Sequence, residues 1–185
     1  MNTNPAQAKK AIQTAAQYMI AMSVELERRA LLQGATDLSS LSEDKKKRAL
    51  ELSAYFTIPE LEGPHRSIPL SAAMQFAHKN KQLNTSLNFA NALLDRTGNA
   101  KMKEMAKKIK TVAERNPADV IEIDFDQFAD FEICAASHTP IYGGSPSAAC
   151  PYDGAKYHGK YKGTVCKVCE VCQIGAPASG LRLVG

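Results

Sequence analysis

The feature that most constrains the fold is a change of hydrophobic pattern at Asn116 and Pro117. Before this point apolar residues recur at the three- and four-residue spacings of amphipathic helices, and after it they alternate with polar residues. All five cysteines lie in the second part, together with many of the Gly and Tyr residues. The sequence therefore predicts an α+β chain, with a helical part over residues 1–117 and a small β-rich part over residues 118–185.

The helical part is typical of a row of antiparallel, solenoid-like helices. Asn4 is a good N-cap residue and Pro5 suits the first position of a helix. One face of this first helix carries Ile12, Ala16, Met19, Leu26 and Ala30, and Gly34 is expected to cap its C-terminus. A second helix is expected to begin near Ser40 or Ser42.

Three further helices are predicted over residues 71–80, 82–97 and 99–115. The connection between the first two is very short, so these two helices are expected to form an antiparallel hairpin. The last helix carries an apolar stripe at helical spacing, formed by Met102, Met105, Ile109 and Val112.

Residues 54–70 interrupt the helical pattern. The β-prone residues Tyr55, Phe56 and Ile58 open this segment, and its prolines exclude one continuous helix. We expect a protruding two-stranded β-hairpin here, although the prolines are also compatible with an irregular loop.

The β-rich part opens with an acidic segment, residues 118–133, that has six acids and no Lys or Arg. Its apolar residues alternate with acidic ones, which predicts a strand with one buried and one acidic face. Further strands are expected over residues 131–135, 164–174 and 180–184, with turns at Gly143 and Gly144 and at Asp153 and Gly154. The prediction is a small unit of five or six strands.

The cysteines suggest a degenerate zinc ribbon. Cys150 is followed at the third position by Asp153, and twelve residues later Cys166 is followed in the same way by Cys169. A zinc ribbon holds its ion between two C-x-x-C turns, but a carboxylate is a harder and less usual ligand than a thiolate. Two interpretations stay open: a structural zinc held by Cys150, Asp153, Cys166 and Cys169, with Cys172 as a substitute ligand, or a decayed ribbon whose cysteines are small core residues. No cofactor is therefore assigned.

Charge and motifs argue against several function classes. The formal net charge of +4 is low for a nucleic-acid-binding protein, and no segment is apolar enough for a membrane span or a signal peptide, so a cytoplasmic protein is expected. Cys134 and His138 lack a third residue that would orient the histidine, and no phosphate-binding loop is found. We expect no enzymatic activity. The alternatives are a zinc-ribbon nucleic-acid-binding module or general protein-interaction module, a thiol enzyme using Cys134 or Cys166, and a self-associating scaffold.

Several sequence blocks resemble one family, the C-terminal region of the alpha subunit of coatomer, the COPI vesicle coat. In the second part they are FEICAAS from Phe131, PIYGG from Pro140, CPYDGA from Cys150 and GAPASGL from Gly175. Upstream they are YMIAMSVELERR from Tyr18, AYFT from Ala54 and ERNPAD from Glu114. The resemblance covers nearly the whole chain.

The resemblance implies a structural coat role in Golgi-to-endoplasmic-reticulum and intra-Golgi vesicle transport, peripheral on Golgi and vesicle membranes and without nucleic acid. It also implies a partner, the epsilon subunit of coatomer, whose tetratricopeptide repeats encircle a protruding hairpin, and contact with the rest of coatomer through regions outside this chain. The segment 54–70 is the hairpin candidate, and its expected partner-binding residues are Tyr55, Phe56, Ile58, Leu61 and His65. The acidic segment 118–133 is a second candidate surface.

Overall fold

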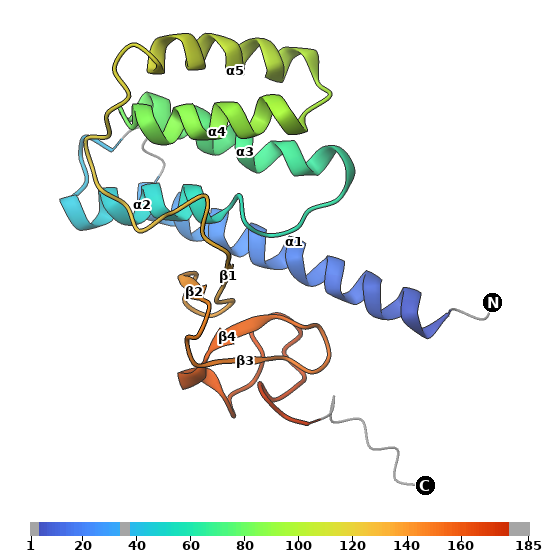
Figure 1. Ribbon diagram of the computed structural model, residues 1–185. Coiled ribbons are helices and arrows are strands. Elements are labelled where there is room, and N and C mark those ends of the chain that lie inside the picture. Colours follow the sequence, from blue (N-terminus) through green and yellow to red (C-terminus); the bar gives the residue numbers. More distant parts are fainter. Residues whose placement is uncertain (1–3, 34–37, 178–185) are drawn as a thin grey trace, which may run out of the picture. The chain divides into compact units, whose positions relative to one another are not determined.

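The computed structural model describes residues 4–33 and 38–177 and has an α+β fold, as predicted (Figure 1). Its helices are α1 (Pro5–Leu32), α2 (Glu43–Tyr55), the 3₁₀ helix η1 (Gly63–Arg66), α3 (Ser67–Lys79), α4 (Leu83–Arg96), α5 (Ala100–Ala113) and the 3₁₀ helix η2 (Gly159–Tyr161). Its strands are β1 (Phe131–Ile133), β2 (Pro140–Tyr142), β3 (Ser147–Ala149) and β4 (Lys156–His158). The predicted cap at Gly34 and strand at 180–184 lie outside the described residues. Within the described ranges, no helix combines the length and the apolar character that a membrane crossing requires.

The chain folds into two compact units that differ from the predicted division at residue 117. We call the first the cysteine unit; its described residues are 4–22, 58–60 and 128–177. We call the second the helical unit; its described residues are 23–33, 38–57 and 61–127. The helix α1 contributes its first part to the cysteine unit and its last part to the helical unit.

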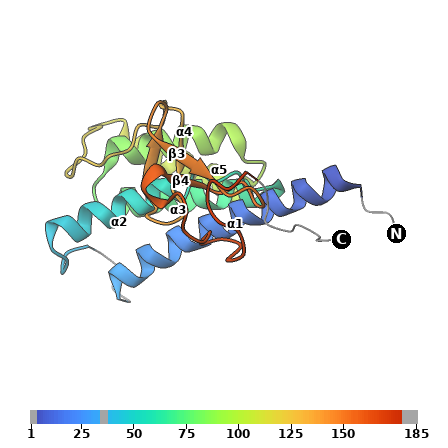
Figure 2. The same ribbon diagram turned by 90° about the horizontal axis from the view of Figure 1, so that it is seen from below.

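The helical unit is built on three helices that lie side by side, α3, α4 and α5 (Figures 1 and 2). Residues 80–82 join α3 to α4, which confirms the predicted short connection. Together with α2, these helices enclose a buried apolar cluster that includes Ala54, Leu70, Met74, Phe89, Leu93 and Ile109. Aliphatic and aromatic residues at helical spacing thus form the core, as the periodicity indicated.

The helix α1 begins where the sequence predicted, but its buried face is a different one. The backbone N–H of Ala6 donates to Asn4 Oδ1 at 3.0 Å, which is the expected cap. The buried residues are Ala16, Ile20, Ala21 and Val24, whereas Met19 and Leu26 of the predicted apolar face are 49% and 61% exposed. Apolar residues occur on more than one face of this helix, so their spacing alone does not decide which face is buried.

The predicted β-hairpin over residues 54–70 is wrong. The helix α2 continues to Tyr55, η1 follows a turn, and α3 begins at Ser67. Pro69 lies in the first turn of α3, where its missing N–H removes no helical hydrogen bond. The β-prone Tyr55 is buried instead, and its hydroxyl donates to the carbonyl of Asp124 at 2.7 Å.

The acidic segment does not form the predicted strand before Phe131, and only its last three residues are in a strand, β1. Residues 121–130 do alternate between half-buried and exposed positions. However, side chains rather than a neighbouring strand satisfy this backbone: Glu51 Oε1 accepts from the N–H of Asp124 at 3.2 Å, and Gln82 Oε1 accepts from that of Ile121 at 3.3 Å. Ile123 and Phe125 pack on the helical cluster, so alternate burial arises here without strand pairing.

The cysteine unit contains two small antiparallel hairpins. In the first, β1 pairs with β2, and in the second β3 pairs with β4 (Figure 1). Ala148 lies opposite Tyr157 in the second hairpin. The described residues hold four strands rather than five or six, because the predicted strand 164–174 is reduced to one bridge between Val165 and Gln173. A tight turn that starts at Cys166 replaces the rest of that strand.

Candidate functional site

Burial separates the five predicted partner-binding residues. Tyr55, Phe56 and Leu61 are 1%, 8% and 6% exposed, so they do not offer the exposed apolar side chains that the prediction assumed. Ile58 is half-buried and His65 is exposed. This difference follows from the absence of the hairpin: in a helix end and a turn, the same aromatic residues pack inward.

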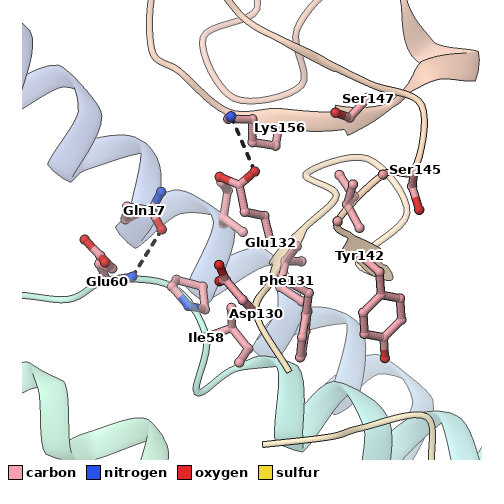
Figure 3. Close-up of a pocket in the computed structure, with 16 residues that line it drawn as sticks. Gln17, Ile58, Glu60, Asp130, Phe131, Glu132, Tyr142, Ser145, Ser147 and Lys156 are labelled. Atoms are coloured by element: carbon pink, nitrogen blue, oxygen red, sulfur yellow. Dashed lines mark hydrogen bonds and ion pairs between the residues drawn. The ribbon is translucent and has the colours of Figure 1, made fainter. Parts of the chain in front are cut away.

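Ile58 lines a groove of about 640 Å³ within the cysteine unit (Figure 3). The first part of α1, the turn 58–60 and the β1–β2 hairpin form its walls. Gln17 on α1 fixes the turn, since its Oε1 accepts from the backbone N–H of Glu60 at 3.1 Å. A side-chain hydrogen bond thus holds one wall of the groove in place, and Ile20 and Ile58 give the groove an apolar part.

The groove is acidic overall. Glu60, Asp130 and Glu132 line it, and Lys156 is the single cationic side chain among its lining residues. Lys156 Nζ lies 3.4 Å from Glu132 Oε2, and this pair is visible in Figure 3. Two carboxylates therefore stay uncompensated by a lining cation, which suits a ligand that presents basic or hydrogen-bond-donating groups.

The second feature is the cluster of metal-ligating side chains predicted from the cysteine spacing. The ligand atoms of Cys150, Asp153, Cys166 and Cys169 all lie within 4.8 Å of one another. The sulfurs of Cys150 and Cys169 are 3.7 Å apart, and Cys166 Sγ lies 3.1 Å from Asp153 Oδ2. Residues from two turns that are distant in sequence thus converge on one point.

The two turns have the same construction. In the first, the N–H of Gly154 donates to the carbonyl of Cys150 at 3.0 Å, and in the second the N–H of Glu170 donates to that of Cys166 at 3.1 Å. Gly154 and Glu170, each directly after the second ligand of its turn, have positive φ angles of 78° and 56°. We call these two segments, residues 150–154 and 166–170, the first and second knuckle. Asp153 occupies the position in the first knuckle that Cys169 occupies in the second.

Groups around Cys166 hold its sulfur in place. The backbone N–H groups of Val168 and Cys169 donate to Cys166 Sγ, both at 3.4 Å. The hydroxyl of the fully buried Tyr157 lies 3.1 Å from the same sulfur and accepts from the N–H of Lys167 at 2.9 Å. Since the Cys166 thiol donates its single proton to Asp153 Oδ2, the Tyr157 hydroxyl is the donor in its contact with the sulfur.

The protein alone does not activate these thiols as nucleophiles. Burial raises the pKa of Cys150 to about 11 and that of Cys166 to about 12, which keeps both thiols protonated at neutral pH. A reactive cysteine requires the opposite shift. Cys134, the other proposed nucleophile, is fully buried and its sulfur accepts from the backbone N–H of His158 at 3.5 Å. This geometry weakens the thiol-enzyme alternative.

A third feature is an exposed apolar stripe on α1, of which Met19 and Leu26, but not Met22, were predicted to lie on the buried face. Met19, Met22 and Leu26 are 49%, 55% and 61% exposed. Their spacing of three and four residues aligns them along one face of the helix. We call these three residues the α1 stripe. Its signal in the sequence was a helix with more apolar residues than one core-facing side requires.

Comparisons with known proteins identify the family of this chain. A family profile that describes the C-terminus of the coatomer (COPI) alpha subunit matches residues 2–185. The chain belongs to this family. The profile covers both units, including the α1 stripe and the two knuckles.

Individual relatives are similar to the chain over nearly its whole length. The coatomer alpha subunit of Saccharomyces cerevisiae is 40% identical over 176 residues, and that of Dictyostelium discoideum is 35% identical over 178 residues. Each alignment covers 95% of this chain but only 14% of the relative. A putative coatomer alpha subunit of Schizosaccharomyces pombe is 37% identical over 165 residues, covering 89% of this chain and 13% of the relative. The chain thus corresponds to about one seventh of these proteins.

Proposed function

We propose that this chain is a docking module of the COPI coat that binds the epsilon subunit of coatomer and catalyses no reaction. The family match over residues 2–185 is the observation that carries the proposal. Relatives named as coatomer alpha subunits, similar over 95% of the chain, support the coat role. Through the coat, the module acts in Golgi-to-endoplasmic-reticulum and intra-Golgi vesicle transport, on the cytoplasmic face of Golgi and vesicle membranes, and contacts the membrane only indirectly.

The α1 stripe is the surface that we assign to this partner. Protein interfaces derive most of their affinity from a few apolar anchors, and a helix presents such anchors at spacings of three and four residues. Met19, Met22 and Leu26 meet both conditions. Methionine also adapts its shape to a partner surface. A partner made of helical repeats offers the concave apolar surface into which such a helix fits.

The groove around Ile58 is the second contact surface, and it retains part of the original prediction. Ile58 is half-buried there and can be tested by substitution. His65 is exposed in the helical unit, outside the residues that line the groove, and is tested separately. Tyr55, Phe56 and Leu61 are buried and support the fold rather than contact a partner directly. Truncating any of them would lower the stability of the chain, so a loss of binding in such a variant would not identify a contact. The groove is mainly polar, so we expect it to contribute less than the α1 stripe.

The test is a calorimetric measurement of binding between the full chain and purified epsilon subunit. Met22→Asp combined with Leu26→Asp is expected to weaken binding at least about 100-fold, since it places two charges in an apolar contact. Ile58→Asp is expected to weaken it about 10-fold. Val112→Asp on α5 is the matched control, because Val112 is also an exposed helical residue, at 49%.

Three outcomes decide the proposal. The proposal is supported if all variants keep their helical circular dichroism, the stripe variant loses the most affinity, Ile58→Asp loses less, and the Val112→Asp control binds normally. Normal binding by the stripe variant, or an equal loss in the Val112→Asp control, would mean that the stripe is not the specific contact surface. Absence of any binding by the unchanged chain at micromolar concentration would refute epsilon docking itself.

A further inference from the structure

We propose that Cys150, Asp153, Cys166 and Cys169 bind one zinc ion, in a structural site that is separate from the docking surface. The two knuckles supply the four ligands, two from each. The zinc site is tested by metal content, so the result does not depend on whether the chain binds the epsilon subunit.

The distances between the donor atoms fit a tetrahedral ion. With a Zn–S distance of about 2.3 Å, two thiolates of a tetrahedral site lie about 3.8 Å apart. The sulfurs of Cys150 and Cys169 are 3.7 Å apart. All four donor atoms fall within 4.8 Å of one another, so one ion reaches every ligand after small side-chain adjustments.

The repeated backbone geometry is the second argument. Each knuckle is closed by the same hydrogen bond and ends in a residue with positive φ. The second of these residues is Glu170, for which this conformation is unfavourable by about 1–2 kcal/mol relative to its usual ones. Glutamate has no intrinsic preference for this conformation, so the turn rather than the residue type imposes it. The backbone N–H groups of Val168 and Cys169 that point at Cys166 Sγ are suited to a thiolate.

The buried carboxylate is the third argument. Asp153 is 4% exposed, and among the described residues no Lys, Arg or His forms an ion pair with it. Its Oδ1 accepts from the N–H of Ala155 at 2.8 Å, and its Oδ2 faces Cys166 Sγ. Buried carboxylates are normally paired with a cation or bound to a metal. A divalent ion between the knuckles supplies that positive charge.

The ligand types select the metal and the role of the site. Three thiolates favour zinc over magnesium or calcium, which prefer oxygen ligands. Four protein ligands close the tetrahedral shell and leave no open position for a substrate, so the role is structural. The Tyr157 hydroxyl, 3.1 Å from Cys166 Sγ, orients that ligand from outside the shell. No backbone hydrogen bond is found between residues 150–154 and 166–170 in the described part of the chain, so the ion would link the two knuckles directly.

The test measures metal in the full chain, purified without added chelator, by mass spectrometry, followed by cobalt(II) titration of the metal-free protein. We expect one zinc per chain and, with cobalt, the intense visible bands of a tetrahedral thiolate site. Cys166→Ser is expected to lower zinc affinity at least about 100-fold and Asp153→Ala about 10- to 100-fold. Asp153→Cys, which completes a second C-x-x-C knuckle, is expected to raise it.

Cys134→Ser is the matched control. Cys134 is buried in the same unit but is not part of the ligand cluster, so this variant should keep the metal. Tyr157→Phe should fold and bind zinc about 10-fold more weakly. Asp153→Cys keeps the test decisive if Cys166→Ser does not fold, because it predicts a gain.

Several results would overturn the assignment. They are a folded chain that contains no zinc and gives no cobalt spectrum, equal metal loss in the Cys134→Ser control, and tetrahedral cobalt binding that survives Asp153→Ala but is abolished by Cys172→Ser. The last result would replace Asp153 by Cys172 in the ligand set.

Discussion

The two units of this chain obtain their stability in different ways. In the helical unit, helices of 13 and 14 residues bury a shared apolar cluster. In the cysteine unit, each strand has only three residues, and three cysteines and an aspartate converge among the buried side chains. Long amphipathic helices bury enough apolar surface to hold one another, whereas hairpins of this length are marginal without further support. The comparison indicates that a small unit with short strands relies on specific polar or metal-binding contacts.

Removal of the proposed zinc should produce the largest difference in stability between the two units. With a chelator, we expect the knuckles and the β3–β4 hairpin to lose more than about 5 kcal/mol of local stability, on the scale of structural zinc sites. The helices α4 and α5 should keep their protection, because their cluster contains no metal ligand. Hydrogen exchange measured by mass spectrometry checks this region by region. A uniform response of both units, or none, would contradict this difference between them.

A cavity in the helical core should have the reverse effect. Leu93 is fully buried in the apolar cluster, so Leu93→Ala is expected to lower the free energy of unfolding by about 3–5 kcal/mol. Zinc content should not change. Urea unfolding measures the loss, and Val112→Ala on the exposed face of α5 is the control, with an expected change below about 0.5 kcal/mol. Metal loss in Leu93→Ala would show that the two units are coupled.

The charge cluster on α1 predicts how pH affects the helical unit. Burial alone would raise the pKa of Glu25, but hydrogen bonds and charges from Arg28 and Arg29, both 2.7 Å away, lower it. The stabilisation is therefore complete above the ordinary glutamate pKa of 4.5 and is lost as pH falls through the lowered value.

Glu25→Gln should accordingly lower stability by about 1–2 kcal/mol at pH 7 and by much less at pH 3. Thermal unfolding across this range measures the effect. Glu104→Gln, which breaks the exposed pair with Lys108 on α5, should change stability little at either pH. A pH-independent loss in Glu25→Gln would mean that packing, not charge, explains the role of this residue.

The smallest expected effect compares two residues with positive φ, one in each unit. Glycine adopts this conformation without the penalty of a side chain, so Glu170→Gly and Lys81→Gly should each stabilise the chain by about 0.5–1 kcal/mol. Glu170→Gly should also tighten zinc binding about 2- to 5-fold, since it favours the second knuckle. Lys81→Gly, between α3 and α4, should leave zinc affinity unchanged. An identical effect of both variants on zinc would argue against a preformed knuckle.

Local signals predicted much of this structure. Asn4 and Pro5 marked the start of α1 because capping depends on adjacent residues alone. The spacing of Cys150, Asp153, Cys166 and Cys169 predicted their convergence, since a turn with two ligands separated by two residues presents both to one point. Residues 121–130 and the turn after Tyr55 were misassigned, because alternation and β propensity report burial and side-chain shape but not the backbone partner.

The sequence by itself determined the helical character of the first part, the helix start at Asn4, the candidate ligand set of the two knuckles and the family. Each depends on spacing or on residues close together in the chain. Only the tertiary structure decided which face of α1 is buried, that Tyr55 packs inward against the Asp124 carbonyl, and that residues 121–130 bind side chains instead of a strand. These outcomes depend on partners 69 residues away for Tyr55 and 39 away for Gln82, and a local pattern contains no information about which distant surface will meet it.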